Sequence, residues 1–174
     1  MKLRKYFILL FAGICLSFQA LSALTIGKVG THYTANGIKW TTVEYYNNDN
    51  GFKASFPGRD KSCISKGNIF IRGEYQEVTY ELHCSINGRY NPPETESEFI
   101  AFIEETFADD VRIVPMPSNQ DKVLYMVDIY FIEESKVARI MCSHNQLYWA
   151  IVEGEGFSLV PLYLDFFEGI EIIK

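Results

Sequence analysis

Apolar and polar positions alternate along much of the chain with the two-residue period of β-strands. Ile38 to Tyr45 and Phe52 to Phe56 follow this pattern and are rich in β-branched and aromatic residues. The segment between them, Asn47 to Gly51, ends in Asn-Gly, which is a strong hairpin signal. Residues 38–57 are therefore predicted to form an antiparallel hairpin that stops at Pro57-Gly58.

Five further runs of β-forming residues predict strands. In the second of them the apolar side chains share one face and the polar side chains the other, which is typical of a strand covered on one side. The later runs have few polar interruptions, which predicts central strands covered on both faces. The cationic stretch 58–67 and the proline-bearing stretch 108–122 are predicted to be connections. The five runs are Asn68–Tyr75, Val78–Ile86, Val123–Ile132, Lys136–Ser143 and Gln146–Glu153.

Two helices are predicted. Thr95 and Glu98 match a capping box, in which each side chain satisfies a backbone amide that the first turn leaves without a partner. The apolar residues that follow recur at helical spacing. A second helix is predicted from Ser158 to Glu168, because Pro161 falls in its first turn and Gly169 past its end; Ile170–Ile173 is then a last strand or an extended tail. The apolar stripe of the first helix is Phe99, Phe102, Ile103 and Phe107.

These elements predict an α+β fold, with an antiparallel β-sheet flanked by helices in an α/β/α sandwich. Residues 38–174 contain no repeat, low-complexity tract or long linker, which predicts a single domain. Aromatic residues make up 15% of the chain and are spread along it, which indicates a substantial core.

Residues 1–23 have the pattern of an export signal. A short basic start precedes an apolar run from Tyr6 to Phe18, and small residues follow, so that cleavage is predicted after Ser22 or Ala23. The run is shorter than the roughly 20 apolar residues that a membrane-spanning helix needs. The sequence therefore predicts a periplasmic or extracellular protein with no membrane span after cleavage, and an uncleaved anchor is the alternative. Residues 24–37 are predicted to be an N-terminal lead-in or a short edge strand.

The charge balance excludes one class of partner. The chain has 16 Lys and Arg residues against 22 Asp and Glu residues, a formal net charge of −6. Residues 1–23 hold three basic residues and no acidic ones, so cleavage leaves 13 basic against 22 acidic residues, a net charge of −9. Such a surface repels phosphate backbones, and nucleic acid is not expected to bind.

Three cysteines follow the signal, namely Cys63, Cys84 and Cys142. In an oxidising compartment two of them could form a disulfide, and the sequence leaves all three pairings open, alongside buried thiols. An exported hydrolase or thiol enzyme that uses one of these cysteines is the alternative function. Its nucleophile would need a base within hydrogen-bond reach, and no local motif supplies one.

Candidate metal ligands are few. Cys142 and His144 point the same way on a predicted strand, but His83 and Cys84 point opposite ways. No C-x-x-C or H-x-x-x-H spacing gathers these four residues around one ion. No metal site, cofactor site or catalytic residue is therefore predicted.

Other motifs have ordinary structural interpretations. The segment from Gly154 to Ser158 lacks the order of a nucleophile elbow and the third glycine of a dinucleotide fingerprint, and is predicted to be a turn. Adjacent acidic residues are predicted to be solvated. Tyrosines near turns are typical of surfaces that bind proteins or glycans, although core packing explains most of them. The acidic pairs are Glu104-Glu105, Asp109-Asp110 and Glu133-Glu134, and the tyrosines are Tyr33, Tyr45, Tyr46, Tyr90 and Tyr125.

Packing motifs follow one another along residues 38–173. They are Gly51-Phe52-x-Ala54-x-Phe56-Pro57, Tyr75, Tyr80-x-Leu82, the capped helix at Phe99–Phe107, Arg139, Tyr148-x-Ala150-x-Val152 and Phe166-Phe167-x-Gly169-Ile170. In this order they resemble the domain shared by the PsbP photosystem proteins, the Mog1 nuclear-import factor and many bacterial exported proteins. The resemblance implies an antiparallel sheet between helical layers. It transfers no site, because proteins of this fold serve as photosystem accessory subunits, as a small-GTPase partner or as uncharacterised bacterial proteins.

Together these observations favour an exported non-enzymatic binding or accessory module that contacts a protein or an envelope component. The export signal, the acidic domain and the abundance of aromatic residues support this hypothesis. A cystatin-like inhibitor is disfavoured, because its long helix precedes the first hairpin, whereas here the helix follows it. The oligomeric state and the position of a binding face stay open.

Overall fold

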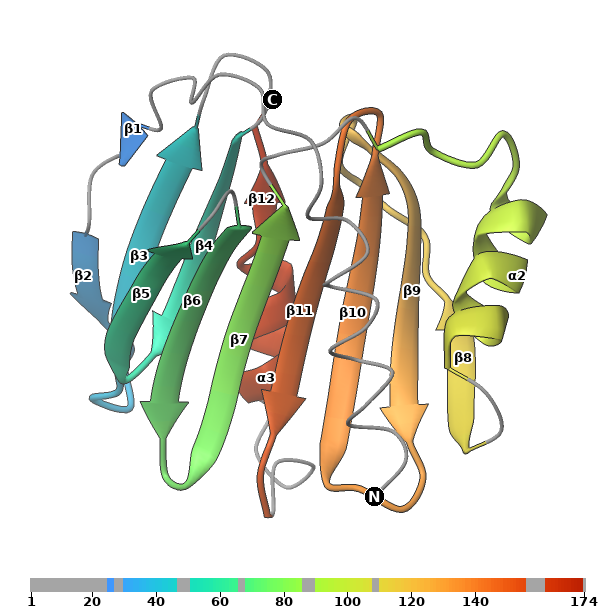
Figure 1. Ribbon diagram of the computed structural model, residues 1–174. Coiled ribbons are helices and arrows are strands. Elements are labelled where there is room, and N and C mark those ends of the chain that lie inside the picture. The colour runs from blue at the N-terminus through green and yellow to red at the C-terminus, as the bar shows by residue number, and fades with distance from the viewer. Residues whose placement is uncertain are drawn as a thin grey trace.

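A computed structural model describes residues 25–26, 30–46, 51–65, 68–85, 90–107, 110–155 and 162–173, with only the backbone at 25–26, 59–65 and 85 (Figure 1). Antiparallel strands make up most of this part of the chain, together with two short helices, so that the fold is α+β and mainly sheet. The predicted export signal, the turn at 47–50 and residues 158–161 lie outside the described residues.

The smaller of two sheets contains both ends of the described chain. Its strands are β1 (Thr25–Ile26), β2 (Gly30–Tyr33), β3 (Lys39–Tyr46), β4 (Gly51–Pro57) and β12 (Glu171–Ile172). Its order is β1-β3-β4-β12, and β2 also pairs with β3, next to β1. The predicted hairpin is confirmed, since β3 and β4 pair antiparallel from Trp40 opposite Pro57 to Tyr46 opposite Gly51. Part of the predicted lead-in thus forms an edge strand.

The larger sheet has seven antiparallel strands in the order β5-β6-β7-β11-β10-β9-β8. Its centre joins β7 to β11, two strands far apart in sequence. The predicted meander of β9, β10 and β11 is confirmed by the pairings on both sides of β10. The strands are β5 (Arg59–Ser65), β6 (Asn68–Tyr75), β7 (Val78–Ser85), β8 (Val111–Pro115), β9 (Val123–Phe131), β10 (Lys136–Ser143) and β11 (Leu147–Glu153).

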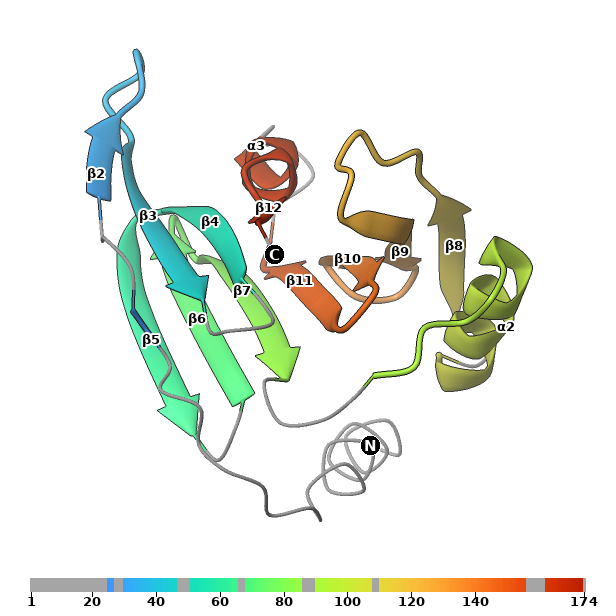
Figure 2. The ribbon, with the colours of Figure 1, turned by 90° about the horizontal axis from the view of Figure 1, so that it is seen from above.

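The two faces of the large sheet are covered differently (Figure 2). The small sheet and helix α3 (Leu162–Glu168) lie on one face, here called the inner face. Helix α2 (Glu96–Thr106) packs on the opposite, outer face, over the end of the sheet formed by β8, β9 and β10. The resulting cores lie back to back and share the sheet between them.

The inner core follows from the alternation of the strands. Every second side chain of β3, β4, β7 and β11 faces inward, where α3 adds its aromatic pair Phe166 and Phe167. The Phe166 ring contacts the rings of Phe56 and Tyr80, with centroid distances of 5.0 and 5.6 Å. Gly73 of β6 lets the sheets approach closely, since a Cβ there would lie 2.9 Å from the Cβ of Phe56. One helix thus joins the two sheets through ring contacts.

The outer core depends on the predicted helix, which is confirmed with its capping box. The Thr95 hydroxyl accepts from the amide of Glu98 at 3.2 Å, and the Glu98 carboxylate accepts from the amide of Thr95 at 3.3 Å. Three residues of the predicted stripe are buried against β9 and β10, whereas Phe102 is half-buried. The three are Phe99, Ile103 and Phe107.

Two predicted connections are wrong, because the structure places strands in them. Residues 59–65 form β5, which pairs with β6 along its whole length. Residues 111–115 form β8, which pairs with β9 although it ends at Pro115. Both are edge strands of the large sheet, where one side of the backbone needs no partner strand. Their polar and proline-containing sequences are therefore compatible with strands.

Candidate functional site

The outer face of the large sheet carries a half-exposed group of aromatic and charged side chains beside the area covered by α2. We call it the outer patch. Its residues come from β6, β7 and β11, three neighbouring strands, and their side chains point to one face because of the strand register. They are Phe70, Arg72, Thr79, Glu81, His83 and Trp149.

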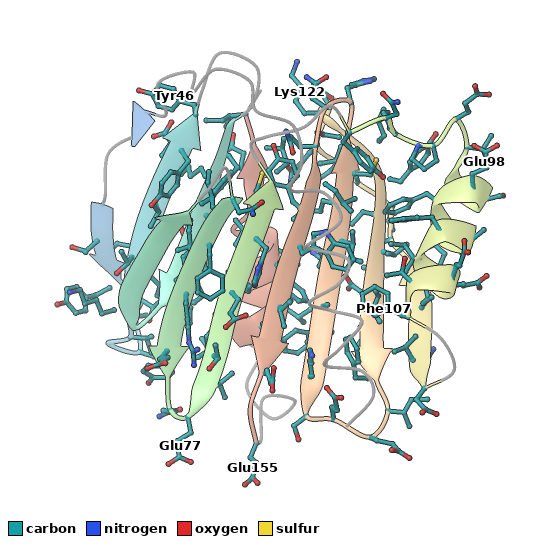
Figure 3. All side chains as sticks on the ribbon, in the orientation of Figure 1. Tyr46, Glu77, Glu98, Phe107, Lys122 and Glu155 are labelled. Atoms are coloured by element: carbon teal, nitrogen blue, oxygen red, sulfur yellow. The ribbon has the colours of Figure 1, made fainter. Side chains whose placement is uncertain are left out.

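A two-residue turn fixes the register that builds the patch. Gln76 and Glu77 join β6 to β7 with φ angles of 49° and 64°, the left-handed conformation of a tight hairpin. Figure 3 shows Glu77 at the same end of the sheet as Glu155, which follows β11. Since a shift of one residue would turn every side chain to the opposite face, this turn determines which residues reach the patch.

The aromatic part of the patch is a row across the three strands. Phe70 lies opposite His83, and His83 lies opposite Trp149. The rings of Phe70 and His83 meet edge to face with centroids 4.7 Å apart. At the other end of the row, the Trp149 ring lies 5.4 Å from that of Phe107. Figure 3 shows Phe107 toward the α2 side of the sheet. The contact with Phe107 joins the row to the outer core and holds Trp149 in place.

The charged part of the patch is the next row along the strands, where Arg72 lies opposite Glu81. The Glu81 carboxylate lies 3.1 Å from Nε2 of His83 and 3.7 Å from the Arg72 guanidinium. The guanidinium also contacts the Glu74 carboxylate at 3.0 Å and donates to the Thr79 hydroxyl at 3.2 Å. The side chains are 39% exposed for Arg72, 20% for Glu81 and 18% for His83, so solvent reaches the network.

This network offers both donors and acceptors to a ligand at the surface. Arg72 supplies only donors, Glu81 only acceptors, and Thr79 and His83 supply either. The Nε atom of Arg72 is buried and has no hydrogen-bond partner among the described residues. Arg72 contributes one positive charge and Glu74 and Glu81 two negative charges, so these three neighbouring charges cancel in part and leave a small negative excess.

A second polar group lies inside the molecule and has a structural role. Arg139 of β10 and Asp128 of β9 form a buried bidentate ion pair, with nitrogen–oxygen distances of 2.7 and 2.9 Å. The guanidinium also lies 4.9 Å from the centre of the Phe167 ring of α3. Burial and the neighbouring Asp128 raise the pKa of Tyr130. Because α3 covers the pair, it is less accessible to a ligand than the outer patch.

The structure separates the four residues considered as metal ligands. His83 lies in the outer patch and Cys84 in the inner core. Cys142 is buried beneath α2, and His144 is exposed in the turn between β10 and β11. Within the described residues, no group of three or more His, Cys, Asp and Glu side chains is arranged to hold a metal ion.

The strand order also decides the question of disulfides. The cysteines lie on β5, β7 and β10, so at least two strand spacings, about 10 Å, separate any two of their Cα atoms. Cysteines whose Cα atoms are more than about 7 Å apart are too distant for a disulfide without backbone movement. None of the three pairings within one molecule is therefore compatible with the backbone. The side chain of Cys63 lies outside the described residues.

Burial keeps two thiols protonated near neutral pH. It raises the pKa of Cys84 to about 12 and that of Cys142 to about 11. A thiol must lose its proton to act as a nucleophile, and reactive cysteines usually have a lowered pKa. The surroundings of these two residues therefore disfavour a catalytic role.

The remaining sequence features have the surroundings expected of structural residues. Gly154 lies in a turn and donates to the carbonyl of Ser135, while Glu104, Glu105, Glu133 and Glu134 are exposed. Asp109 and residues 156–158 lie outside the described residues. Among the five tyrosines only Tyr33 is largely exposed, at 68%, whereas Tyr45 is buried and Tyr46, Tyr90 and Tyr125 are half-buried. Core packing accounts for most of them, as predicted.

Comparisons with protein-family models, with curated proteins and with solved structures find no match to this chain. Within the described residues, neither helix has the length and apolar character needed to cross a membrane.

Sequence reasoning missed the outer patch. Phe70, Arg72 and Glu81 were not recognised as members of a site, and His83 was considered only as a metal ligand. The available signal was the alternation of β6, β7 and β11, which assigns these residues to strand faces. Only the pairing of β7 with β11 brings Trp149 beside His83.

Proposed function

We propose that this protein is an exported, non-enzymatic binding or accessory module that contacts a protein or an envelope component through the outer patch. The observation that carries the proposal is the half-exposed row of Phe70, His83 and Trp149 beside the network of Arg72 and Glu81. Aromatic and arginine side chains supply much of the affinity at binding surfaces. The strands and the tight hairpin hold these side chains in place, which lowers the entropy lost on binding.

An enzyme has less support. Cys84 and Cys142 are buried thiols with raised pKa values. Glu81 and His83 form a pair that resembles a base and its orienting group, but the hydroxyl of the neighbouring Thr79 accepts from Arg72. A reaction would need the hydroxyl or thiol to be activated by the base itself.

We also propose that the domain belongs to the PsbP/Mog1 type and forms an α/β/α sandwich. The support is the order of elements, in which a hairpin, further strands, a helix, the four antiparallel strands β8 to β11 and a second helix follow one another. The residues that carry the resemblance are mostly buried together in the inner core. They include Phe52, Ala54, Phe56, Tyr80, Leu82, Tyr148, Ala150, Val152, Phe166, Phe167 and Ile170.

The export step is tested by expressing the full chain with a C-terminal tag in a bacterium and separating the periplasm from the cytoplasm. We expect the periplasmic protein to begin at Ala23 or Leu24, as N-terminal sequencing would show. The intact precursor in the cytoplasm would contradict export, and the intact precursor in the membrane would show that the segment is an anchor.

The binding face is tested with a photo-reactive phenylalanine analogue at position 70. The matched control carries the same analogue at Tyr33, an exposed aromatic residue on β2 of the small sheet. After irradiation in envelope extract, we expect a discrete cross-linked product from position 70 and none from position 33. Equal products at both positions, or none at position 70, would rule out the outer patch as the contact surface.

A further inference from the structure

We infer that the outer patch binds an uncharged saccharide chain. This inference rests on the proposed function and specifies the ligand of the same site. A sugar ring presents an apolar face of C–H groups and a rim of hydroxyls, and the patch offers a surface for each. The aromatic row of Phe70, His83 and Trp149 fits the apolar face, and the polar row of Arg72 and Glu81 fits the rim.

The aromatic row has the dimensions of an extended ligand. Adjacent strands lie about 4.8 Å apart, so the row from Phe70 to Trp149 covers two spacings, about 10 Å. That length seats a short oligosaccharide that runs across the strands. The rings are fixed by their contacts, Phe70 with His83 at 4.7 Å and Trp149 with Phe107 at 5.4 Å, so little side-chain freedom is lost when a sugar binds.

The polar row matches hydroxyl groups in particular. A hydroxyl donates one hydrogen bond and accepts others, so it needs both kinds of partner nearby. Arg72 donates and Glu81 accepts, and their terminal atoms lie 3.7 Å apart, close enough to serve neighbouring hydroxyls of one ring. Thr79, bonded to Arg72 at 3.2 Å, adds a group that can do either. Hydrogen bonds to charged groups are the stronger ones, which favours this arrangement for a neutral ligand.

The charges of the patch favour a neutral ligand over a charged one. Arg72 faces two carboxylates, Glu74 and Glu81, and the next residue along the edge of the patch, Glu153, is exposed and lies 4.0 Å from the Lys136 ammonium. A polyanion would meet these carboxylates and the net charge of the whole chain, −6. A polycation would have to displace Arg72 from Glu74 and Glu81 and Lys136 from Glu153. An uncharged chain of hydroxyls avoids both penalties.

The test uses the purified full chain and the fluorescence of Trp149. Trp40, the other tryptophan of the chain, is buried in the small sheet and is replaced by Phe to remove its signal. The probes are neutral oligosaccharides, namely hexamers of β-linked glucose, α-linked glucose and N-acetylglucosamine. Heparin and polylysine serve as charged comparisons. We expect a saturable change with at least one neutral hexamer and a weaker change, or none, with the charged polymers.

Variants then locate the binding. Phe70→Ala removes a ring of the row, and Glu81→Gln preserves the size of the side chain while removing the charge. We expect each to weaken saccharide affinity at least tenfold, because a hydrogen bond to a charged group or a stacked ring is lost. The matched control Tyr33→Ala should bind as the parent does. Thermal unfolding of each variant shows whether it is folded. If Phe70→Ala does not fold, Glu81→Gln still tests the inference.

The inference is overturned if no neutral hexamer binds, if heparin or polylysine binds more tightly, or if folded variants of the patch bind as well as the control. A discrete protein cross-link at position 70 without saccharide binding would leave the binding module standing and refute only the ligand class. Loss of both the cross-link and saccharide binding would refute the proposed function as well.

Discussion

At the scale of single residues, the ion pair of Asp128 and Arg139 imposes the strictest requirement. The two side chains face each other on adjacent strands and are buried beneath α3. Each charge has lost most of its hydration, and the bidentate contact compensates for that loss. Removing one partner would leave the other charged, buried and without compensation. The packing of β9 against β10 is therefore expected to be sensitive even to replacing one carboxylate oxygen of Asp128 by an amide nitrogen.

Asp128→Asn is expected to destabilise the protein by about 3–5 kcal/mol, because it leaves the Arg139 guanidinium buried without a counter-charge. Urea denaturation gives the change in the free energy of unfolding. The control is Glu171→Gln, which removes the exposed contact with Lys53 and is expected to cost less than about 1 kcal/mol. Equal losses from the two variants would show that burial gives the inner pair no special importance.

The thiols of Cys84 and Cys142 make stability depend on alkaline pH. Their pKa values rise on folding to about 12 and about 11, above the ordinary value of 9.0. Their contribution to stability is therefore complete below about pH 9 and is lost as the pH rises through 11 to 12. We expect the free energy of unfolding in urea to fall steadily above about pH 9. Burial raises the pKa of Tyr80 to about 12 and acts in the same direction.

Alkylation gives a direct check on the same two cysteines. Iodoacetamide at about pH 8 should leave the peptides that contain Cys84 and Cys142 unmodified in the native protein and modify them in urea, as mass spectrometry would show. Constant stability up to about pH 11, or rapid native labelling of either residue, would contradict the raised pKa values and revive the thiol-enzyme hypothesis.

At the scale of elements, the sequence predicted what local interactions determine. The helix cap at Thr95 and the hairpin of β3 and β4 depend on residues a few positions apart, and both were found. The edge strands β5 and β8 depend on partners supplied by the fold and were missed. On either side of β8, the Asp110 carbonyl accepts from the Ile132 amide and the Met116 amide donates to the Met126 carbonyl. This register turns the nitrogen of Pro115 toward the open edge. Proline is harmless there, although it suggests a loop in the sequence.

The candidate site was hidden for a related reason. Alternation assigns Phe70, His83 and Trp149 each to one face of a strand, but it does not say which strands are neighbours. The pairing of β7 with β11 passes over α2, β8, β9 and β10, and no residue of either strand encodes it locally. Element type was thus predictable and strand order was not.

The cap of α2 provides the test at this scale. Thr95→Ala removes the hydroxyl that accepts from the amide of Glu98 and is expected to cost about 1 kcal/mol. Ser97→Ala is the control, because Ser97 is an exposed hydroxyl in the first turn of the same helix and is not the capping residue. Its expected effect is within about 0.5 kcal/mol. Thermal or urea unfolding measures both, and a loss from Ser97→Ala as large as that from Thr95→Ala would disprove the role of the cap.

At the scale of the whole molecule, the C-terminal segment joins the two sheets. The chain leaves the small sheet at Gly58 and returns to it through α3 and β12, which pairs with β4. The amide of Gln120, from the connection between β8 and β9, donates to the carbonyl of Ile170 at 2.7 Å and accepts from the amide of Ile172 at 2.8 Å. The small sheet is thus tied to the large one by packing and by the hydrogen bonds of Gln120 to the C-terminal segment.

Such a molecule should unfold as one cooperative unit, and its two tryptophans can show this because each belongs to a different sheet. Trp40→Phe leaves Trp149 as the reporter of the large sheet, and Trp149→Phe leaves Trp40 as the reporter of the small one. Each variant has its own stability, so in each the fluorescence midpoint in urea should coincide with that of circular dichroism.

Adding Phe166→Ala to either tryptophan variant should lower its free energy of unfolding by about 3–5 kcal/mol, since this ring fills the space between the sheets. In the Trp149→Phe variant, fluorescence of Trp40 changing at lower urea than circular dichroism would mean that the small sheet opens first, and α3 would then fail to unite the two halves.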